Sequence, residues 1–361
     1  MKRTFGAVAC AVACFAHPAH AQEDDGFEGR AAPPTAAGTT ALALEVRPGL
    51  EVFAQYAYRR TEHPSGPASW YHEFDVPRVH VALDAKAEDA RGRVVVEGVR
   101  SAAEGALIGV AGNSIVFRAR EAFAAYSFKW VEASAGLVPK LALPEIEGTW
   151  MLRAVAPAPE EVHGFLAPAD LGANVRATLP QGYGFVGVGA YNGEGYANRE
   201  LNRGKNAELA LSVHPIPKGL LKPLALFAGY ELGSTGTGRA RADRLSGALL
   251  WQGKRLRGGA AATWAWGLAD DGAQRALMLD AFVRAEPVED VLLGLRGSHF
   301  LRDTRASDDT LTVVDAAVGY RVAAPLQVFL AATRSLPSST AADAIPGSRY
   351  WEGRLVSRVA F

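Results

Sequence analysis

From residue 50 to the C-terminus the chain is a succession of segments of about ten residues, most of them bounded by Gly, Pro, Asn or Asp. Apolar and polar residues alternate within them; Leu209 and Leu211, for example, interleave with Glu208 and Ser212. A period of two places the two kinds of side chain on opposite faces of a β-strand. The sequence therefore predicts about sixteen strands, at 50–59, 74–85, 91–100, 118–128, 130–138, 171–179, 183–192, 205–214, 222–232, 244–252, 255–266, 275–285, 289–301, 310–321, 325–333 and 348–361.

The connections between these segments alternate in length. Those after even-numbered strands are short, such as Lys129, whereas those after odd-numbered strands are mostly long, such as 139–170, with 267–274 as an intermediate member. Short turns at one end and long loops at the other are typical of an all-β, transmembrane antiparallel barrel, whose turns are periplasmic and whose loops are extracellular. A large soluble all-β protein also fits the composition, but it has no reason to alternate its connections in this way.

The last strand ends the chain on an aromatic residue. Trp351, Leu355, Val359 and Phe361 share one face of the predicted strand. An apolar face with an aromatic at each end resembles the closing strand of a bacterial outer-membrane barrel. Phe361 is then the signal by which the barrel-assembly machinery binds the C-terminal strand. An ordinary edge strand is the alternative.

The N-terminus has the features of a secretory signal peptide at residues 1–21. A basic start and an apolar run precede the small-residue cleavage site Ala19-His20-Ala21. Both cysteines, Cys10 and Cys14, lie in this segment, so the mature chain has none; a lipoprotein site at Cys14 is the alternative. Residues 22–49, rich in Ala, Pro, Glu and Thr, predict a flexible arm ahead of a barrel at 50–361.

Charge and motifs exclude several function classes. The 38 basic and 38 acidic residues leave no basic field for nucleic acid. After the signal peptide no run of about twenty apolar residues predicts a transmembrane helix. No metal-binding, nucleophile-elbow or phosphate-loop motif occurs, so we predict no enzyme, no metal and no cofactor. A catalytic set assembled from distant strands would escape this test.

A barrel of sixteen strands encloses more space than side chains fill, so the architecture predicts a water-filled channel for small ions and hydrophilic solutes. Charged side chains are costly against lipid, which places the polar strand faces inside. The predicted lumen-facing basic residues outnumber the carboxylates slightly and favour weak anion preference; cross-strand pairs that brace the wall are the alternative. They are Arg78, Arg93, Arg176, Arg244, Arg255, Arg257, Arg296, Arg321, Arg354 and Arg358.

Several short stretches resemble the phosphate-selective porin O and P family: 137–140, 144–145, 151–153, 165–172 and 189–195. The resemblance implies a homotrimeric outer-membrane porin, in contact with outer-membrane lipid, whose third loop folds inward to form a constriction. The predicted constriction residues are Lys140, Glu145, Glu147 and Arg153. Phosphate-specific members cluster lysines on this loop, whereas this chain has several carboxylates there, which argues against phosphate selectivity and could make the constriction cation-preferring. A surface loop over the mouth, a membrane-embedded barrel enzyme and a non-conducting structural or adhesin-like barrel remain alternatives.

Overall fold

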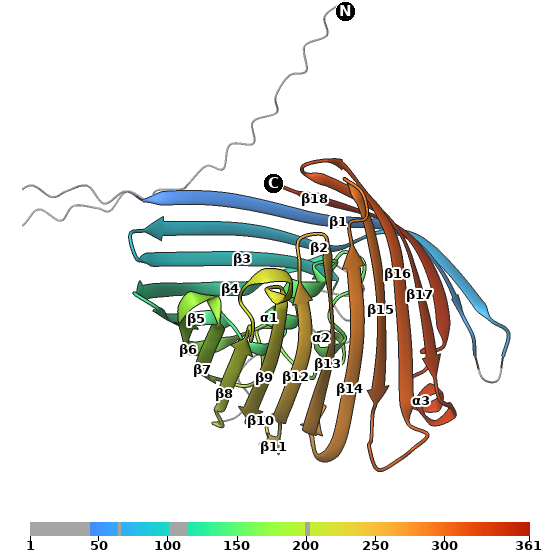
Figure 1. Ribbon diagram of the computed structural model, residues 1–361. Coiled ribbons are helices and arrows are strands. Elements are labelled where there is room, and N and C mark those ends of the chain that lie inside the picture. The colour runs from blue at the N-terminus through green and yellow to red at the C-terminus, as the bar shows by residue number, and fades with distance from the viewer. Residues whose placement is uncertain (1–43, 64–65, 101–114, 199–202) are drawn as a thin grey trace, which may run out of the picture. The chain divides into compact units, whose positions relative to one another are not determined.

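The computed structural model describes residues 44–63, 66–100, 115–198 and 203–361. In this part of the chain sixteen antiparallel strands form one closed barrel, in which β18 pairs with β1 (Figure 1). The strands are β1 (Glu45–Thr61), β2 (Ser69–Ala87), β3 (Ala90–Arg100), β4 (Ile115–Phe128), β5 (Val131–Pro139), β6 (Ala169–Leu179), β7 (Gly184–Tyr191), β8 (Asn206–Val213), β9 (Leu224–Leu232), β12 (Asp243–Gln252), β13 (Leu256–Leu268), β14 (Asp271–Ala285), β15 (Val291–Leu301), β16 (Thr310–Ala323), β17 (Leu326–Pro337) and β18 (Tyr350–Ala360).

Smaller elements decorate the barrel. They are the hairpin β10 (Ser234–Thr235) with β11 (Ala240–Arg241), the helices α1 (Ala142–Trp150), α2 (Pro159–Val162) and α3 (Ser339–Ala344), and the 3-10 turns η1 (Pro180–Gly182) and η2 (Gly219–Leu221). None of the helices in the described ranges is both long and apolar enough to span a bilayer. The predicted signal peptide and most of the predicted arm lie outside the described residues.

The predicted barrel is confirmed, and each predicted strand overlaps one barrel strand. Several boundaries were wrong; β2, for example, begins at Ser69 rather than at residue 74. β1 begins at Glu45, so the end of the predicted arm pairs with β2. The predicted loop at 267–274 is a two-residue turn, because β13 ends at Leu268 and β14 begins at Asp271. Ala269 and Asp270 both have positive φ, at 51° and 63°, which is the geometry of a type I′ hairpin turn.

The strand faces follow the predicted alternation. On β8 the side chains of Leu209 and Leu211 are exposed on the outside, whereas Glu208 and Ser212 are buried on the inside. The same outward apolar face continues around the barrel, for instance at Val318 and Leu330. Aromatic rings gather at the long-loop end, where the ring centroid of Tyr58 lies 5.5 Å from those of both Trp70 and Trp351. The outer surface of the barrel is therefore an apolar band with an aromatic cluster at that end.

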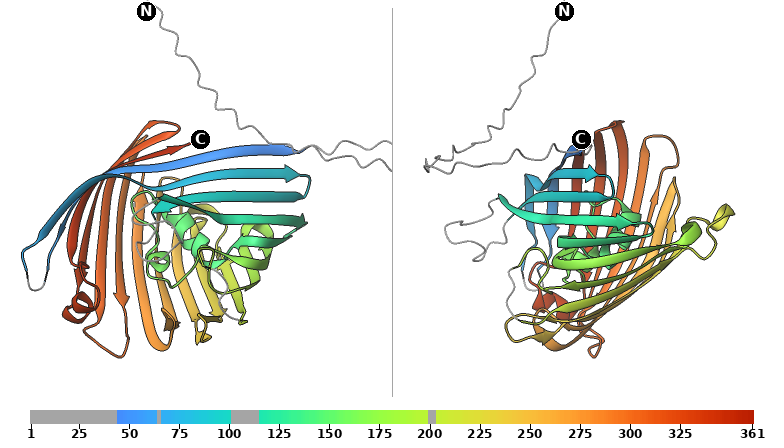
Figure 2. Two further views of the ribbon diagram at one scale, coloured as in Figure 1. Left: turned by 180° about the vertical axis from the view of Figure 1, so that it is seen from behind. Right: turned by 90° about the vertical axis from the view of Figure 1, so that its left-hand side faces the viewer.

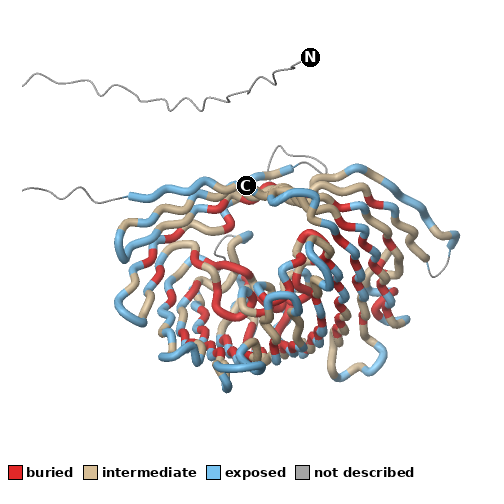
Figure 3. Tube along the Cα trace, turned by 45° about the horizontal axis from the view of Figure 1, so that its top comes forward, coloured by how far each residue is buried: buried red, intermediate tan, exposed pale blue. Residues whose placement is uncertain are grey.

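The long connection between β5 and β6 folds into the barrel. We call residues 140–168 the inner segment; it contains α1 and α2 and lies against one side of the interior (Figures 2 and 3). Leu143, Ile146 and Trp150 recur at helical spacing on α1 and are at most 1% exposed. They belong to one apolar cluster with inward-facing residues of the barrel such as Phe227 and Phe282.

Candidate functional site

The inner segment divides the interior surface of the barrel into two parts. We call β7–β9 and β12–β15 the covered wall, because the segment packs on their inward side chains. We call β1–β4 and β16–β18 the open wall; inward side chains such as Arg93 and Arg358 stay 36% and 34% exposed there. The candidate site is the interior between the inner segment and the open wall.

A buried polar anchor fixes the start of the inner segment. Glu208 of β8 accepts the backbone N–H groups of Leu141 and Ala142 at 3.1 Å, which satisfies the free donors at the start of α1. The ammonium of Lys140 pairs with Glu231 of β9. Burial opposes the charge of Lys140, but Glu231 and Glu208 outweigh it and raise its pKa. Lys140 therefore serves as an attachment point as well as lining the neighbouring cavities.

Two glycines of the covered wall permit close approach of the segment. A Cβ on Gly187 would lie 2.8 Å from the Leu141 side chain, and one on Gly294 would lie 2.6 Å from Leu152. Heavy atoms do not approach a Cβ so closely, so a larger residue at either position would force the Leu141 or Leu152 side chain to move. Trp150 completes the contact by donating from its indole nitrogen to the Ala156 carbonyl at 2.9 Å.

The other predicted constriction residues lie on or near α1. The Glu145 carboxylate accepts from Ser212 of β8 at 3.0 Å and from Gln252 of β12 at 3.4 Å. Glu147 pairs with Arg153, and Arg153 also binds Glu161 of α2 at 2.7 Å. Burial opposes the charge of Arg153, but these two carboxylates outweigh it and raise its pKa. The structure thus brings Glu147 and Arg153 together in one chain of charges and places Glu145 against the covered wall.

This chain of charges meets a cluster of arginines on the open wall. Glu161 lies 3.7 Å from Arg78 of β2 and 3.8 Å from Arg120 of β4. Both arginines also reach Glu97 of β3, at 2.6 and 3.2 Å. Glu97 is fully buried and in addition receives Arg118, His80 and the Tyr196 hydroxyl. Because two carboxylates, Glu97 and Glu161, face three guanidinium groups, this cluster keeps a small excess of positive charge.

Most of the predicted lumen arginines form ion pairs with carboxylates, mainly across neighbouring strands. Two exceptions are Arg354, whose partner lies on the same strand β18, and Arg321, whose partner lies in the turn before β15. The pairs are Arg78 with Glu97, Arg93 with Asp84 and Glu121, Arg296 with Asp280, Arg321 with Asp290, Arg354 with Glu352, and Arg358 with Glu51. Arg244 instead donates to the carbonyl oxygens of Phe165 and Gly267, at 2.8 and 2.7 Å. Arg255 is exposed in the turn between β12 and β13 rather than inside the barrel. These pairs match the bracing role left open as an alternative.

Besides Arg244 and Arg255, two more of the predicted lumen arginines, Arg176 and Arg257, form no ion pair with a carboxylate within 4 Å in the described ranges. Arg176 of β6 lies over the Phe185 ring at 3.7 Å, and Arg257 of β13 donates to the Gly148 carbonyl at 3.2 Å. Both line a cavity of about 400 Å³ at the short-turn end, beside α1, which Glu145 also lines. With two guanidinium groups and one carboxylate, this cavity has an excess of positive charge.

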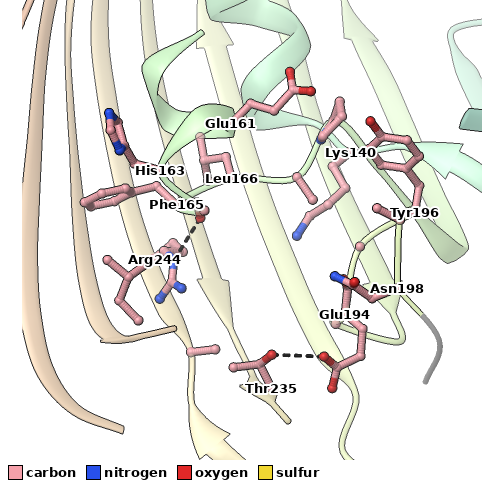
Figure 4. Close-up of a pocket in the computed structure, with 18 of the residues that line it drawn as sticks. Lys140, Glu161, His163, Phe165, Leu166, Glu194, Tyr196, Asn198, Thr235 and Arg244 are labelled. Carbon is pink, nitrogen blue, oxygen red and sulfur yellow. Dashed lines mark hydrogen bonds between the residues drawn. The ribbon is translucent and has the colours of Figure 1, made fainter. Parts of the chain in front are cut away.

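A second cavity, of about 510 Å³, lies at the long-loop end between the inner segment and the loops after β7 and β9 (Figure 4). Its lining includes Arg118, Tyr196 and Asn198, together with His163 of the inner segment. Burial lowers the pKa of His163 to about 4, so its ring is neutral at neutral pH. Glu194 accepts from the Thr235 hydroxyl at 3.0 Å, which links the loops after β7 and β9 beside the cavity.

The C-terminal residue takes part in barrel closure. The backbone N–H of Phe361 donates to the Leu50 carbonyl at 2.9 Å, and the Leu50 N–H donates back at 3.3 Å. The Phe361 side chain remains 76% exposed on the end of the closing strand. Such a free aromatic terminus is compatible with the predicted assembly signal, which stays a prediction. In the described part of the chain no group of His, Cys, Asp or Glu side chains is arranged to hold a metal ion.

Sequence reasoning did not predict that Arg120 faces the barrel interior. The β3–β4 register shifts between Val95 and Val96, and this bulge turns both Arg120 and Glu121 toward the interior. A strict period of two cannot place both on one face. The covered wall, by contrast, left a signal: Ala225 and Phe227 of β9 point inward between outward apolar residues, so that strand is apolar on both faces.

The sequence matches no protein-family model, and no curated protein sequence matches it. Solved structures share the fold. They include OmpF of Salmonella typhi in complex with daunomycin (TM-score 0.65, 10% identity, 88% of this chain and 97% of that chain). An anion-selective porin from Comamonas acidovorans is also similar (TM-score 0.60, 13% identity, 88% and 100%). So is OmpT, an outer membrane protein of Vibrio cholerae, in its trimer form (TM-score 0.57, 11% identity, 88% and 100%). At these identities the likeness establishes the closed barrel fold.

Proposed function

We propose that this chain forms a water-filled outer-membrane channel for passive diffusion of small hydrophilic solutes. The inner segment narrows the channel from the covered wall, and solutes pass between it and the open wall. Lys140, Glu145, Glu147 and Arg153 set the position and charge of the constriction, with Glu161 facing the arginines of β2 and β4.

The observation that carries this proposal is the contrast between the outer and inner faces of the open wall. Outward residues are apolar, such as Leu330 at 69% exposed. Inward residues are charged and still reach solvent, such as Asp84 at 44% exposed. Charged side chains are stable there only if the interior contains water. A closed barrel with an apolar outside and a wet inside conducts solutes along its axis.

Weak anion preference follows from the distribution of unpaired charge. Arginines held by carboxylates contribute little net field, whereas Arg176 and Arg257 leave an excess of positive charge at the short-turn end. The similar porin from Comamonas acidovorans is anion-selective, which supports this preference. Phosphate is one anion to test, and membership of the phosphate-selective porin O and P family stays a prediction.

Location and assembly belong to the same proposal. Residues 1–21 direct export, Phe361 presents the closing strand to the barrel-assembly machinery, and the apolar band contacts outer-membrane lipid. A homotrimer is proposed by analogy with the trimer form of the similar OmpT of Vibrio cholerae. We propose a channel rather than an enzyme, because most carboxylates and arginines of the interior pair with one another.

The test is the reversal potential of the purified mature protein in a planar bilayer across a salt gradient. We expect single-channel currents and a reversal potential on the anion-selective side. A reversal potential on the cation-selective side would mean that Glu145 and Glu147 determine the ion selectivity. Folded protein that conducts no current would contradict the channel and favour a non-conducting barrel, or an enzyme if it proved catalytically active.

A further inference from the structure

α2 carries two consecutive carboxylates in opposite surroundings. Glu161 is held by Arg153 and approached by Arg78 and Arg120. Glu160 is fully buried between the inner segment and the covered wall. Neither of its carboxylate oxygens has a hydrogen-bond partner in the described part of the chain. A buried carboxylate without partners is costly to ionise, so its protonation state bears on whether the segment stays in place.

The charges that face Glu160 do not balance it. Arg296 of β15 is near, with Nη2 3.7 Å from Glu160 Oε2. That guanidinium already binds Asp280 of β14 through two hydrogen bonds, of 2.9 and 2.6 Å. Trp150 and Phe282 lie 5.4 and 5.2 Å from it and keep the site apolar. From α1, Glu147 adds further repulsion. An ionised Glu160 therefore leaves excess negative charge in a dry contact.

The consequence for pH has a definite sign. Burial, followed by the Asp280 carboxylate, raises the pKa of Glu160 from 4.5 to about 7. The docked segment thus binds the proton more tightly than the released segment does, and docking is strongest at low pH. As the pH rises from 4.5 toward 7, the ratio of docked to released segment falls by up to about tenfold per pH unit. Above that range the ratio changes no further.

We propose that Glu160 is a proton-operated latch, which holds residues 157–166 on β14 and β15 when protonated and releases them when ionised. The segment is tied at its start by Lys140 and Glu231, and Glu161 already lies beside Arg78 and Arg120 of the open wall. We therefore expect released residues to shift toward the open wall and narrow the channel. The effect on conductance rests on the proposed channel function, whereas the release of residues 157–166 does not.

The first experiment measures release without relying on conduction. Leu166 is 5% exposed, and its backbone N–H donates to the Glu160 carbonyl at 3.0 Å, so it moves with Glu160. The full-length mature chain carrying Leu166→Cys is labelled with a thiol reagent at several pH values, with and without Glu160→Gln. Because the ionisation of the thiol is common to both backgrounds, the ratio of their labelling rates isolates Glu160. We expect the labelling rate with Glu160, divided by the rate with Glu160→Gln, to rise by up to about tenfold per pH unit between 4.5 and 7.

Two further variants sharpen the test. Asp280→Asn frees Arg296 to pair with Glu160 and should remove most of the pH dependence. Asp303→Asn, at a partly exposed carboxylate that pairs with Arg305 in the loop after β15, should leave the pH dependence of labelling unchanged. Equal labelling rates with and without Glu160→Gln at every pH would overturn the latch.

The second experiment measures single-channel conductance over the same pH range. We expect the conductance of the unmodified chain to fall as the pH rises, while Glu160→Gln keeps its low-pH value. A pH-dependent labelling ratio from a chain that never conducts would support the latch and contradict the channel. If the unmodified chain and Glu160→Gln conduct equally at every pH and are labelled at equal rates, the latch is contradicted and the channel is supported.

Discussion

The covered and open walls are built from the same kind of strand, yet their interiors differ. Both present apolar side chains outward. On the covered wall the inward residues Ala225, Ala276 and Met278 are fully buried under the inner segment. On the open wall the inward charged residues Arg93 and Asp84 stay 36% and 44% exposed, although inward apolar residues of β17 and β18 such as Phe329 and Val356 are buried. Strand alternation thus makes the outer face of both walls apolar. The inward residues determine whether the inner segment covers a wall or leaves it exposed to solvent.

The difference also explains how one loop can be placed stably inside a wet barrel. Apolar inward residues give α1 a surface to bury, and Gly187 and Gly294 let it approach closely. Glu208 and Glu231 supply the polar contacts at its start. On the open wall such contacts are replaced by cross-strand ion pairs, which keep long charged side chains against the wall.

The largest effect should come from removing the main apolar contact of the covered wall. Trp150→Ala should lower the free energy of unfolding by about 3–5 kcal/mol, because it empties a fully buried site between the segment and Phe282. Urea unfolding of the refolded barrel measures this change. The matched control is Val162→Ala on α2, where the side chain is 58% exposed and little should change. Equal costs for both variants would mean that the segment is not packed on the wall.

The next effect contrasts the outer and inner faces of the open wall at neighbouring positions of β2. Val81 points outward and is 48% exposed, whereas Ala82 points inward. Val81→Arg should cost about 2–4 kcal/mol of stability in a bilayer, and Ala82→Arg little, because only the first places a charge in lipid. Folding yield into lipid vesicles and urea titration measure the pair. Equal tolerance would contradict the assignment of faces.

The smallest effect concerns selectivity. Arg176→Gln or Arg257→Gln should lower the anion-to-cation permeability ratio roughly two- to fourfold each, because a unit charge about 10 Å from a passing ion in water acts with about 0.4 kcal/mol. Arg93→Gln should change the ratio less, since Arg93 is paired with Asp84 and Glu121. Reversal potentials across a salt gradient measure all three variants. A larger shift from Arg93 than from the unpaired arginines would reverse the proposed origin of selectivity.

Much of the barrel could be predicted from the sequence because its alternation and its connection lengths are local signals. The errors were local too. Gly267 and Asp270 suggest a loop, but they also suit the tight turn that joins β13 to β14. Pro48 and Gly49 suggest an arm, although β1 pairs with β2 through both.

The candidate site was less predictable because its contacts join residues far apart in the sequence. Lys140 and Glu231 form one buried pair, and nothing in the sequence links them. The charged groups that face Glu160 come from α1, β14 and β15. Only the apolar inward faces of strands such as β9 and β14 could have indicated which wall the segment covers, and reading them requires the register to be known.

The most direct test of the two-wall account is the modification of single cysteines during conduction. Residues 22–361 contain no cysteine, since Cys10 and Cys14 both precede residue 22. Ala82→Cys places a thiol on the inner face of the open wall, and Ala210→Cys places one on the covered wall, where Ala210 is fully buried. A charged thiol reagent added to a conducting channel should reduce the current through the first variant and leave the second unchanged. Equal effects on both variants, or a block of only the second, would contradict a channel that runs along the open wall.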